Sequence, residues 1–146
     1  MNFDYSDDQK MLKDEARKFL AAKCDGKVVR GVLDHDDRAY DEALWKGVAE
    51  QGWLGAAIPE EFGGLGLGHV ELCALAEELG RACAPIPFAS TVYFVAEALM
   101  KFGSQEQKAK WLPKIAAGEV IGAFATAEGK GPVTARSIKT SVSGGK

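Results

Sequence analysis

Features that would place this chain in a specialised class are scarce. It has three cysteines and two histidines among 146 residues. Cys24, Cys73 and Cys83 form no CxxC pair and cannot all pair within one chain, which argues against a disulfide framework. His35 and His69 stand far apart in the sequence, so no metal site is indicated. No run approaches the ~20 apolar residues of a membrane span.

Strong charge of one sign is also missing. The chain carries 18 Lys and Arg against 21 Asp and Glu, a net charge of -3. This balance gives no electrostatic reason to expect nucleic acid or an anionic membrane as a partner, so an apolar protein or small molecule fits better. The amino terminus "MNFDYSDDQK" is acidic where a targeting peptide would be basic. Together with the unpaired cysteines, it predicts a cytoplasmic protein.

Most of the chain carries helical patterns. Capping boxes at Ser6 and Ser104 each place a glutamine three residues after a serine, which marks a helix start. Asp41 is the expected N-cap of another helix, and Gly52 its end. The spacing of apolar residues predicts helices over 6–24, 41–52, 69–81, 88–103 and 104–112, with a final turn from Pro113 to Gly118.

Two stretches between these helices lack helical periodicity. The acidic segment 31–40 is expected to be a loop. Segment 53–68 holds five glycines and a proline, too many for a helix interior, and is expected to be a connection. Pro85 and Pro87 interrupt the chain again, because a proline disfavours helical geometry in the residue before it.

The period changes after residue 118. The run "VIGAFAT" (120–126) is β-branched, small and aromatic, and "SIKTSV" (137–142) alternates apolar and polar residues, which predicts two strands. Gly144 and Gly145 suit a hairpin turn. A ribbon of two strands is marginal alone. We therefore expect this chain to be the front part of something longer.

Catalytic motifs are mostly absent. In "GGLGLG" (63–68), His69 stands where the last glycine of a dinucleotide-binding motif belongs, and "GKG" (129–131) lacks the remainder of a phosphate-binding loop. Glu77 and Glu78 are neighbouring carboxylates that could divide acid and base roles. The simpler interpretation is one solvated residue and one capping or pairing residue. These residues alone indicate no chemistry.

The order of motifs resembles the acyl-CoA dehydrogenase family. The likeness rests on "FDYSDDQKMLKDEARKFL", "LWKGVAEQGWLGAAIPEEFGGLGLG", "ALAEELGR" and "FGSQEQKAKWLPKIAAGE" running into "IGAFATAEG". Family members have a helical amino-terminal domain, a β-barrel-like middle domain and a carboxy-terminal helix bundle. The resemblance implies a mainly α fold: an antiparallel helical bundle over 1–118, followed at 119–146 by the first two strands of a truncated β-barrel-like domain.

The resemblance also implies a reaction and partners. The family uses FAD to insert a double bond between the α and β carbons of an acyl-CoA thioester, and electrons pass to electron-transfer flavoprotein or a similar acceptor. The family's catalytic base usually lies in the carboxy-terminal bundle, so no catalytic residue is expected here. A homo-tetramer or hetero-oligomer is implied for the full-length protein.

By the same resemblance, residues after the first expected strand contact the flavin. The positions carried over are Phe124, Thr126, Ala127, Glu128 and Val133. Ala127 stands where the family has threonine, and Pro132 and Val133 replace Gly-Ser. Each lost polar contact is worth about 0.5–1.5 kcal/mol, so FAD binding is expected to be weakened. The hydroxyl of Thr126, one position earlier, offers a replacement.

The acyl chain in the family lies against the start of the helix after the "CAPIP" break. The matching positions are Pro87, Ser90, Thr91 and Phe94, for which ordinary core packing is the alternative. Two other functions stay open. The departures from the family pattern suit a flavin-poor, non-catalytic subunit of a heteromeric acyl-CoA dehydrogenase, and the bundle pattern alone suits a helical interaction domain.

Overall fold

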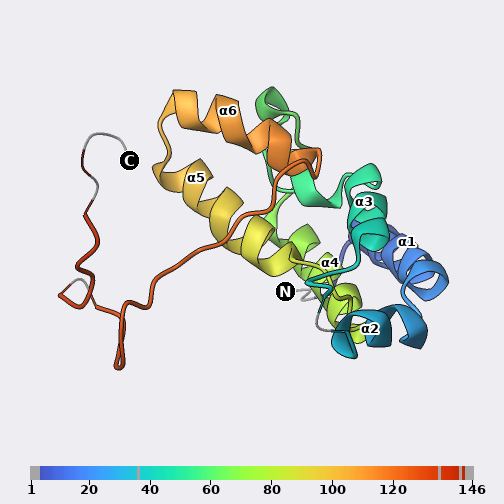
Figure 1. Cartoon of the computed structure of the whole chain (residues 1–146). Coiled ribbons are helices and arrows are strands. Elements are labelled where there is room, and N and C mark those ends of the chain that lie inside the picture. The colour runs from blue at the N-terminus through green and yellow to red at the C-terminus, as the bar shows by residue number, and fades with distance from the viewer. Residues whose placement is uncertain (1–3, 36, 135, 142, 144–146) are drawn as a thin grey trace.

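A computed structural model describes residues 4–35, 37–134, 136–141 and 143, and helices are the only regular elements within these ranges (Figure 1). Two short 3-10 turns, η1 and η2, and a π-helix, η3, accompany the α-helices. In chain order the elements are α1 (Asp7–Lys23), α2 (Gly26–Leu33), α3 (Glu42–Glu50), η1 (Trp53–Gly55), η2 (Glu60–Phe62), α4 (His69–Arg81), η3 (Ala89–Ala96), α5 (Glu97–Phe102) and α6 (Gln105–Ala116).

Helices α1 and α4 pack along their whole length and run parallel. Gln9 donates to Glu71 at 2.8 Å, Arg17 to Glu78 at 2.7 Å, and the Cys24 thiol to the Ala82 carbonyl at 3.5 Å. Both partners advance together along the sequence, so the antiparallel arrangement expected for the bundle is wrong for this pair. After α1 the chain returns through α3 and the loop that follows it. It thus reaches the end of the pair at which α1 began, and α4 begins there.

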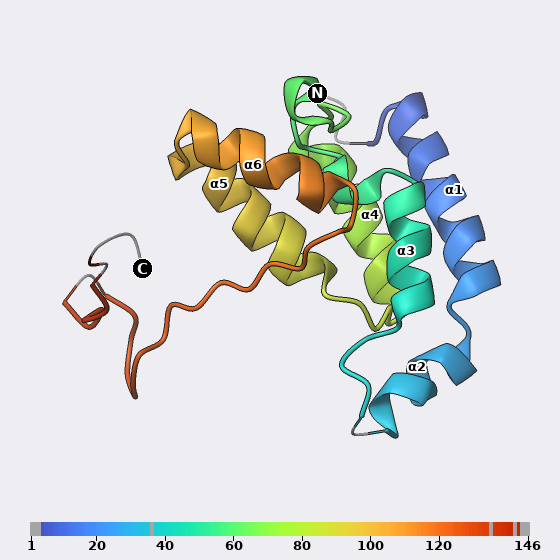
Figure 2. The same ribbon diagram turned by 45° about the horizontal axis from the view of Figure 1, so that its top comes forward.

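The second pair of helices is antiparallel. Only Gly103 and Ser104 connect α5 to α6, and so short a link turns the chain back on itself. Figure 2 shows α1, α3 and α4 gathered on one side and α5 and α6 forming a separate pair.

Buried apolar side chains form two clusters. The larger joins α1, α3, η1, α4 and the start of η3, with Leu20, Val48, Leu54 and Leu75 fully buried. The smaller lies between η3 and α6 around Leu112 and Ile115. These clusters fix the position of η3, which carries three of the four residues expected to form the acyl wall.

The glycine-rich segment 53–68 is an ordered connection. Its two arms bond to one another: Leu65 donates to the Gly55 carbonyl at 2.9 Å, Gly66 to Ile58 at 2.9 Å, and Leu67 to Ala56 at 2.8 Å. Gly64 sits where the arms touch, and a Cβ there would overlap the Ile58 carbonyl and lie 2.5 Å from the Ile58 Cβ. The contact requires glycine at this position.

Local signals placed most helix ends correctly. Ser6, Ser104 and Asp41 each accept the backbone hydrogen bond expected of a cap. Gly118, at φ 72°, follows the last turn of α6, and Glu119 N–H donates to the Lys114 carbonyl at 2.9 Å, the bonding pattern of a glycine C-cap. The Trp45 indole donates to the Gly118 carbonyl at 3.0 Å, tying α3 to this end.

Two expectations about helices were wrong. Segment 31–40 is not all loop, because α2 extends to Leu33. Asp25 caps that helix by accepting from Lys27 and Val28, a local signal in a helix too short to show clear periodicity. Helix α6 also continues through Pro113 without restarting. The missing N–H there costs one bond, and the buried Leu112 and Ile115 on either side hold the helix together.

The predicted strands 120–126 and 137–142 are not present among the described residues of the carboxy-terminal segment. Val142 and the Gly144–Gly145 turn lie outside those residues. After α6 the chain crosses the ribbon of η3 and α5 and extends away from the helices (Figure 1). A strand requires ladder hydrogen bonds to a neighbour. Here two backbone N–H groups of the second run instead donate to a side chain, Glu128.

No helix among the described residues is long and apolar enough to cross a membrane.

The α1–α4 contact encloses a carboxylate. Glu78 is 1% exposed and accepts from Arg17 at 2.7 and 3.1 Å and from Arg81 at 2.7 Å. The Arg17 hydrogen bond, assisted by Arg81, lowers the pKa of Glu78 to about 2 against the opposing effect of burial. Its neighbour Glu77 is exposed and pairs with Lys13 and Tyr5. Glu78 is therefore the expected pairing residue, whereas Glu77 is exposed as expected but is paired as well.

We expect Glu78→Gln to lower the free energy of unfolding at pH 7 by about 1.5–3 kcal/mol, because two guanidinium groups lose their buried anion. Since the folded pKa lies below the unfolded one, the contribution of Glu78 is present above about pH 4.5 and is lost as the pH falls toward 2. The deficit of the variant should shrink over that range in urea titrations. Glu77→Gln is the control and should cost clearly less, because the Glu77 carboxylate is exposed and its ion pair is screened by water. Equal losses for the two variants would contradict this assignment.

We also expect Gly64→Ala to destabilise the fold by about 3 kcal/mol or more, because its methyl group would overlap backbone atoms that cannot move aside. Gly80→Ala in α4 has no atom within 4 Å of the added methyl group and should be neutral or slightly stabilising. Thermal unfolding of both variants tests this. A Gly64 variant as stable as the Gly80 variant would refute the close contact.

Candidate functional site

The π-helix η3 is the structural centre of the predicted acyl wall. It begins just after Pro87, whose carbonyl accepts from the Thr91 N–H at 3.3 Å. Its inner face buries Thr91, Val92 and Ala96, while Phe94 points outward and is 54% exposed. A π-helix places more residues in each turn than an α-helix, and such turns occur frequently at functional sites.

The segment after α6 crosses η3 at Gly122. The Gly122 N–H donates to the Thr91 hydroxyl oxygen at 3.0 Å, and that hydroxyl lies 3.5 Å from the Gly122 carbonyl oxygen, to which it donates. A Cβ on Gly122 would lie 2.7–2.9 Å from three side-chain atoms of Val95. Only glycine allows this approach of backbone to helix.

Two residues further on, Phe124 stacks on Phe94. The ring centroids are 6.1 Å apart and the planes meet at 16°. Both rings are 54% exposed. One ring belongs to the predicted acyl wall and the other to the predicted flavin segment, so the structure brings one residue of each set together.

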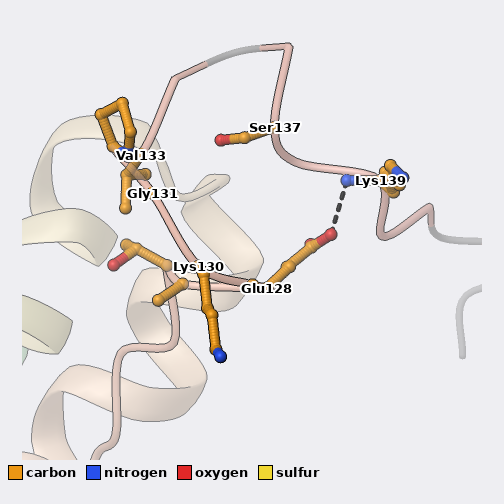
Figure 3. A pocket seen from close by; sticks show the side chains of 10 residues that line it. Glu128, Lys130, Gly131, Val133, Ser137 and Lys139 are labelled. Carbon is orange, nitrogen blue, oxygen red and sulfur yellow. Dashed lines mark hydrogen bonds between the residues drawn. The ribbon is translucent and has the colours of Figure 1, made fainter.

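The remaining flavin-segment residues line an open pocket of about 240 Å³ between Thr126 and Lys139, which includes Ala127, Glu128 and Val133. Figure 3 shows the Glu128 side chain reaching across the loop to the backbone of Lys139. The Glu128 carboxylate accepts from the N–H of Lys139 at 2.6 Å and of Thr140 at 3.1 Å. A side-chain hydrogen bond with Thr140, followed by those from the backbone N–H groups of Lys139 and Thr140, lowers the pKa of Glu128. The carboxylate therefore holds the loop closed as an anion.

These residues suit one edge of a flavin. Within the described residues, no acceptor pairs with the backbone N–H groups of Ala125, Thr126 and Ala127, so these exposed donors are available to ring acceptors. Lys130 and Lys139 add positive charge beside the pocket, which suits a phosphate. Pockets that bury a whole ligand usually exceed about 300 Å³, so this one can take only part of such a molecule.

The predicted acyl-wall residues do not share one environment. Pro87 and Ser90 are partly buried, and the Ser90 hydroxyl donates to the Pro87 carbonyl at 3.2 Å. Thr91 is 0% exposed and Phe94 faces outward. The contact between Gly122 and Val95 was not expected from the sequence. The only signal was a glycine within an apolar run. The assignments of the acyl-wall residues to the substrate and of the flavin-segment residues to FAD stay predictions.

A second hollow, of about 220 Å³, lies beside the crossing. It is mainly apolar, and its lining comes from η3, α5, α6 and the segment that follows: Val95, Leu99, Trp111, Ile115, Val120, Ile121 and Gly122. None of these residues belongs to the predicted sites. Elsewhere in the described ranges, no group of three His, Cys, Asp or Glu residues could hold a metal ion.

Comparison with known proteins gives the family. The pattern of the acyl-CoA dehydrogenase N-terminal domain matches residues 6–119. Acryloyl-CoA reductase (NADH) from Anaerotignum propionicum is 33% identical over 141 residues, which cover 96% of this chain and 35% of that protein. The chain thus spans about a third of this curated relative.

Comparison with solved structures leads to the same family. An acyl-CoA dehydrogenase complexed with FAD from Bacillus anthracis superposes with a TM-score of 0.77 at 32% identity, covering 88% of this chain and 22% of that one. The ChsE4-ChsE5 complex from Mycobacterium tuberculosis gives a TM-score of 0.68 at 31% identity, covering 82% and 30%. From the matched pattern and these likenesses, the chain belongs to the acyl-CoA dehydrogenase family, whose N-terminal domain it contains.

Proposed function

We propose that this chain supplies the acyl wall and one edge of the flavin site of a FAD-dependent acyl-CoA dehydrogenase. The observation that carries the proposal is the contact between the two predicted sets of residues. Phe94 of the acyl wall stacks on Phe124 of the flavin segment, and Gly122 lies against η3 beside them. A dehydrogenase must hold acyl chain and flavin side by side, which this contact favours.

Separate parts of the chain would bind each molecule. A bound FAD would supply the acceptor for the hydride that leaves the acyl β-carbon. The free N–H groups at 125–127 would donate to its ring, and Glu128 would keep the loop in the shape that presents them. Phe94 and Ser90 would face the acyl chain. The base that removes the α-proton is expected outside these residues.

A second candidate function is a flavin-poor subunit that completes a partner's site. Ala127, Pro132 and Val133 each lack a polar group that the family pattern carries. The likeness to the ChsE4-ChsE5 complex, which is named for two components, favours this alternative. In either case we propose an acyl-CoA thioester as substrate, a homo-tetramer or hetero-oligomer, and an electron-transfer flavoprotein or similar acceptor.

The first test concerns FAD. We expect Ala127→Thr to tighten FAD binding by about twofold to tenfold, because the restored hydroxyl can add one hydrogen bond of about 0.5–1.5 kcal/mol. Fluorescence titration of the full chain with FAD measures this. Ala109→Thr, at an exposed position of α6, is the matched control and should change nothing. If neither the parent chain nor Ala127→Thr binds FAD, the flavin-poor candidate replaces the first.

The second test concerns the acyl wall. We expect Phe94→Ala to shift binding preference toward longer or bulkier acyl groups, because removing the ring widens the space beside Phe124. Calorimetry with a series of acyl-CoA thioesters, in the presence of FAD, measures the dissociation constants. Phe102→Ala, which removes a ring that is 85% exposed on α5, should leave the series unchanged. An unaltered preference in the Phe94 variant would remove this residue from the wall.

A further inference from the structure

We infer that Thr91 is a positioning residue: its buried hydroxyl holds Gly122 against η3 and thereby sets where Phe124 and the loop after it lie. The effect of Thr91 on the FAD site rests on the proposed function, whereas the contact between Thr91 and Gly122 does not. The inference gives Thr91 a role different from the substrate contact expected by resemblance, because a side chain that is 0% exposed has no surface left for an acyl chain.

The bonding of Thr91 differs from that of the residue beside it. A hydroxyl within a helix ordinarily donates to a carbonyl of the preceding turn, and Ser90 does so with Pro87. Thr91 instead bonds both backbone polar groups of Gly122, thirty-one positions away in the chain. A buried hydroxyl without these partners would cost about 1–3 kcal/mol. The hydroxyl is therefore directed at one particular backbone position.

Val95 closes the other side of the same contact. It lies one turn after Thr91 on η3, and its side chain occupies the space that a Cβ on Gly122 would take, at 2.7–2.9 Å. The hydrogen bonds draw the segment toward η3 while Val95 limits its approach. Gly122 is thus held from two directions, which defines its height above the π-helix.

Gly122 is also the last partly buried residue of the described chain. Every described residue from 123 onward is exposed, and the Phe94–Phe124 stack is the ring contact that follows the crossing. A displacement at Gly122 would therefore carry Phe124 and the Glu128 loop with it. Since rate depends on the alignment of reacting atoms, a contact remote from the flavin pocket controls the spacing of acyl wall and flavin edge.

The test compares Thr91→Val, which keeps the shape and removes the hydroxyl, with Thr91→Ser, which keeps the hydroxyl. NMR of the full chain would follow amide exchange at Gly122 and the ring signals of Phe124. In Thr91→Val we expect Gly122 exchange to accelerate by about threefold to tenfold, from the loss of one hydrogen bond, and the Phe124 signals to shift. Amides of α1 and α4 should keep their protection. Thr91→Ser should restore the parent values, and Ser90→Ala should leave them unchanged.

Parent-like Gly122 exchange and Phe124 signals in Thr91→Val would overturn the inference. So would equal loss of protection at Gly122, α1 and α4, because that result indicates a purely structural role.

If Thr91→Val does not fold, the variant Gly122→Ala provides the test. Shifted Phe124 signals with protected α1 and α4 amides support positioning, and unshifted signals refute it. A FAD titration on the same samples separates the two proposals. If neither the parent chain nor Ala127→Thr binds FAD, the flavin-poor candidate replaces the first proposed function, while the Gly122 measurement still decides the role of Thr91.

Discussion

One backbone position, Gly122, connects the two parts of this molecule. Before it lie the packed helices, and beyond it every described residue is exposed. The connection depends on a buried hydroxyl on one side and on the absence of a side chain on the other. Hydrogen bonding and steric exclusion act at the same point, so the segment is located in both directions. A loop that binds a ligand has to be held in place by rigid neighbouring elements, and two independent contacts hold this one.

The helical body provides that scaffold through long-range contacts. The parallel α1–α4 pair carries a buried carboxylate between two guanidinium groups, and the ordered glycine loop closes against Ile58. Ile58 belongs to the smaller apolar cluster, which also contains Ala96 at the end of η3. The position of the π-helix is thus determined by contacts distributed over the whole helical body. The exposed segment, with few buried contacts, is suited to binding a ligand.

Prediction from the sequence succeeded where the groups that determine a structural feature are close together in the chain. Capping at Ser6, Asp41 and Ser104, and the end of α6 at Gly118, each depend on groups within about five residues. It failed where neighbours in space decide. The run 120–126 has strand composition but no ladder partner among the described residues, so it is extended without being a strand. The candidate site was anticipated only by resemblance, and the Thr91–Gly122 contact was not anticipated.

The sequence by itself determined most of the helix boundaries, the glycine-rich connection and the family, because caps, periodicity and motif order are properties of neighbouring residues. Only the tertiary structure decided that α1 and α4 run parallel, that Glu78 rather than Glu77 is buried, and that Thr91 bonds Gly122. The physical reason is distance along the chain. Each of these contacts joins residues at least thirty-one positions apart, and no local pattern encodes which distant group will be close enough to bond.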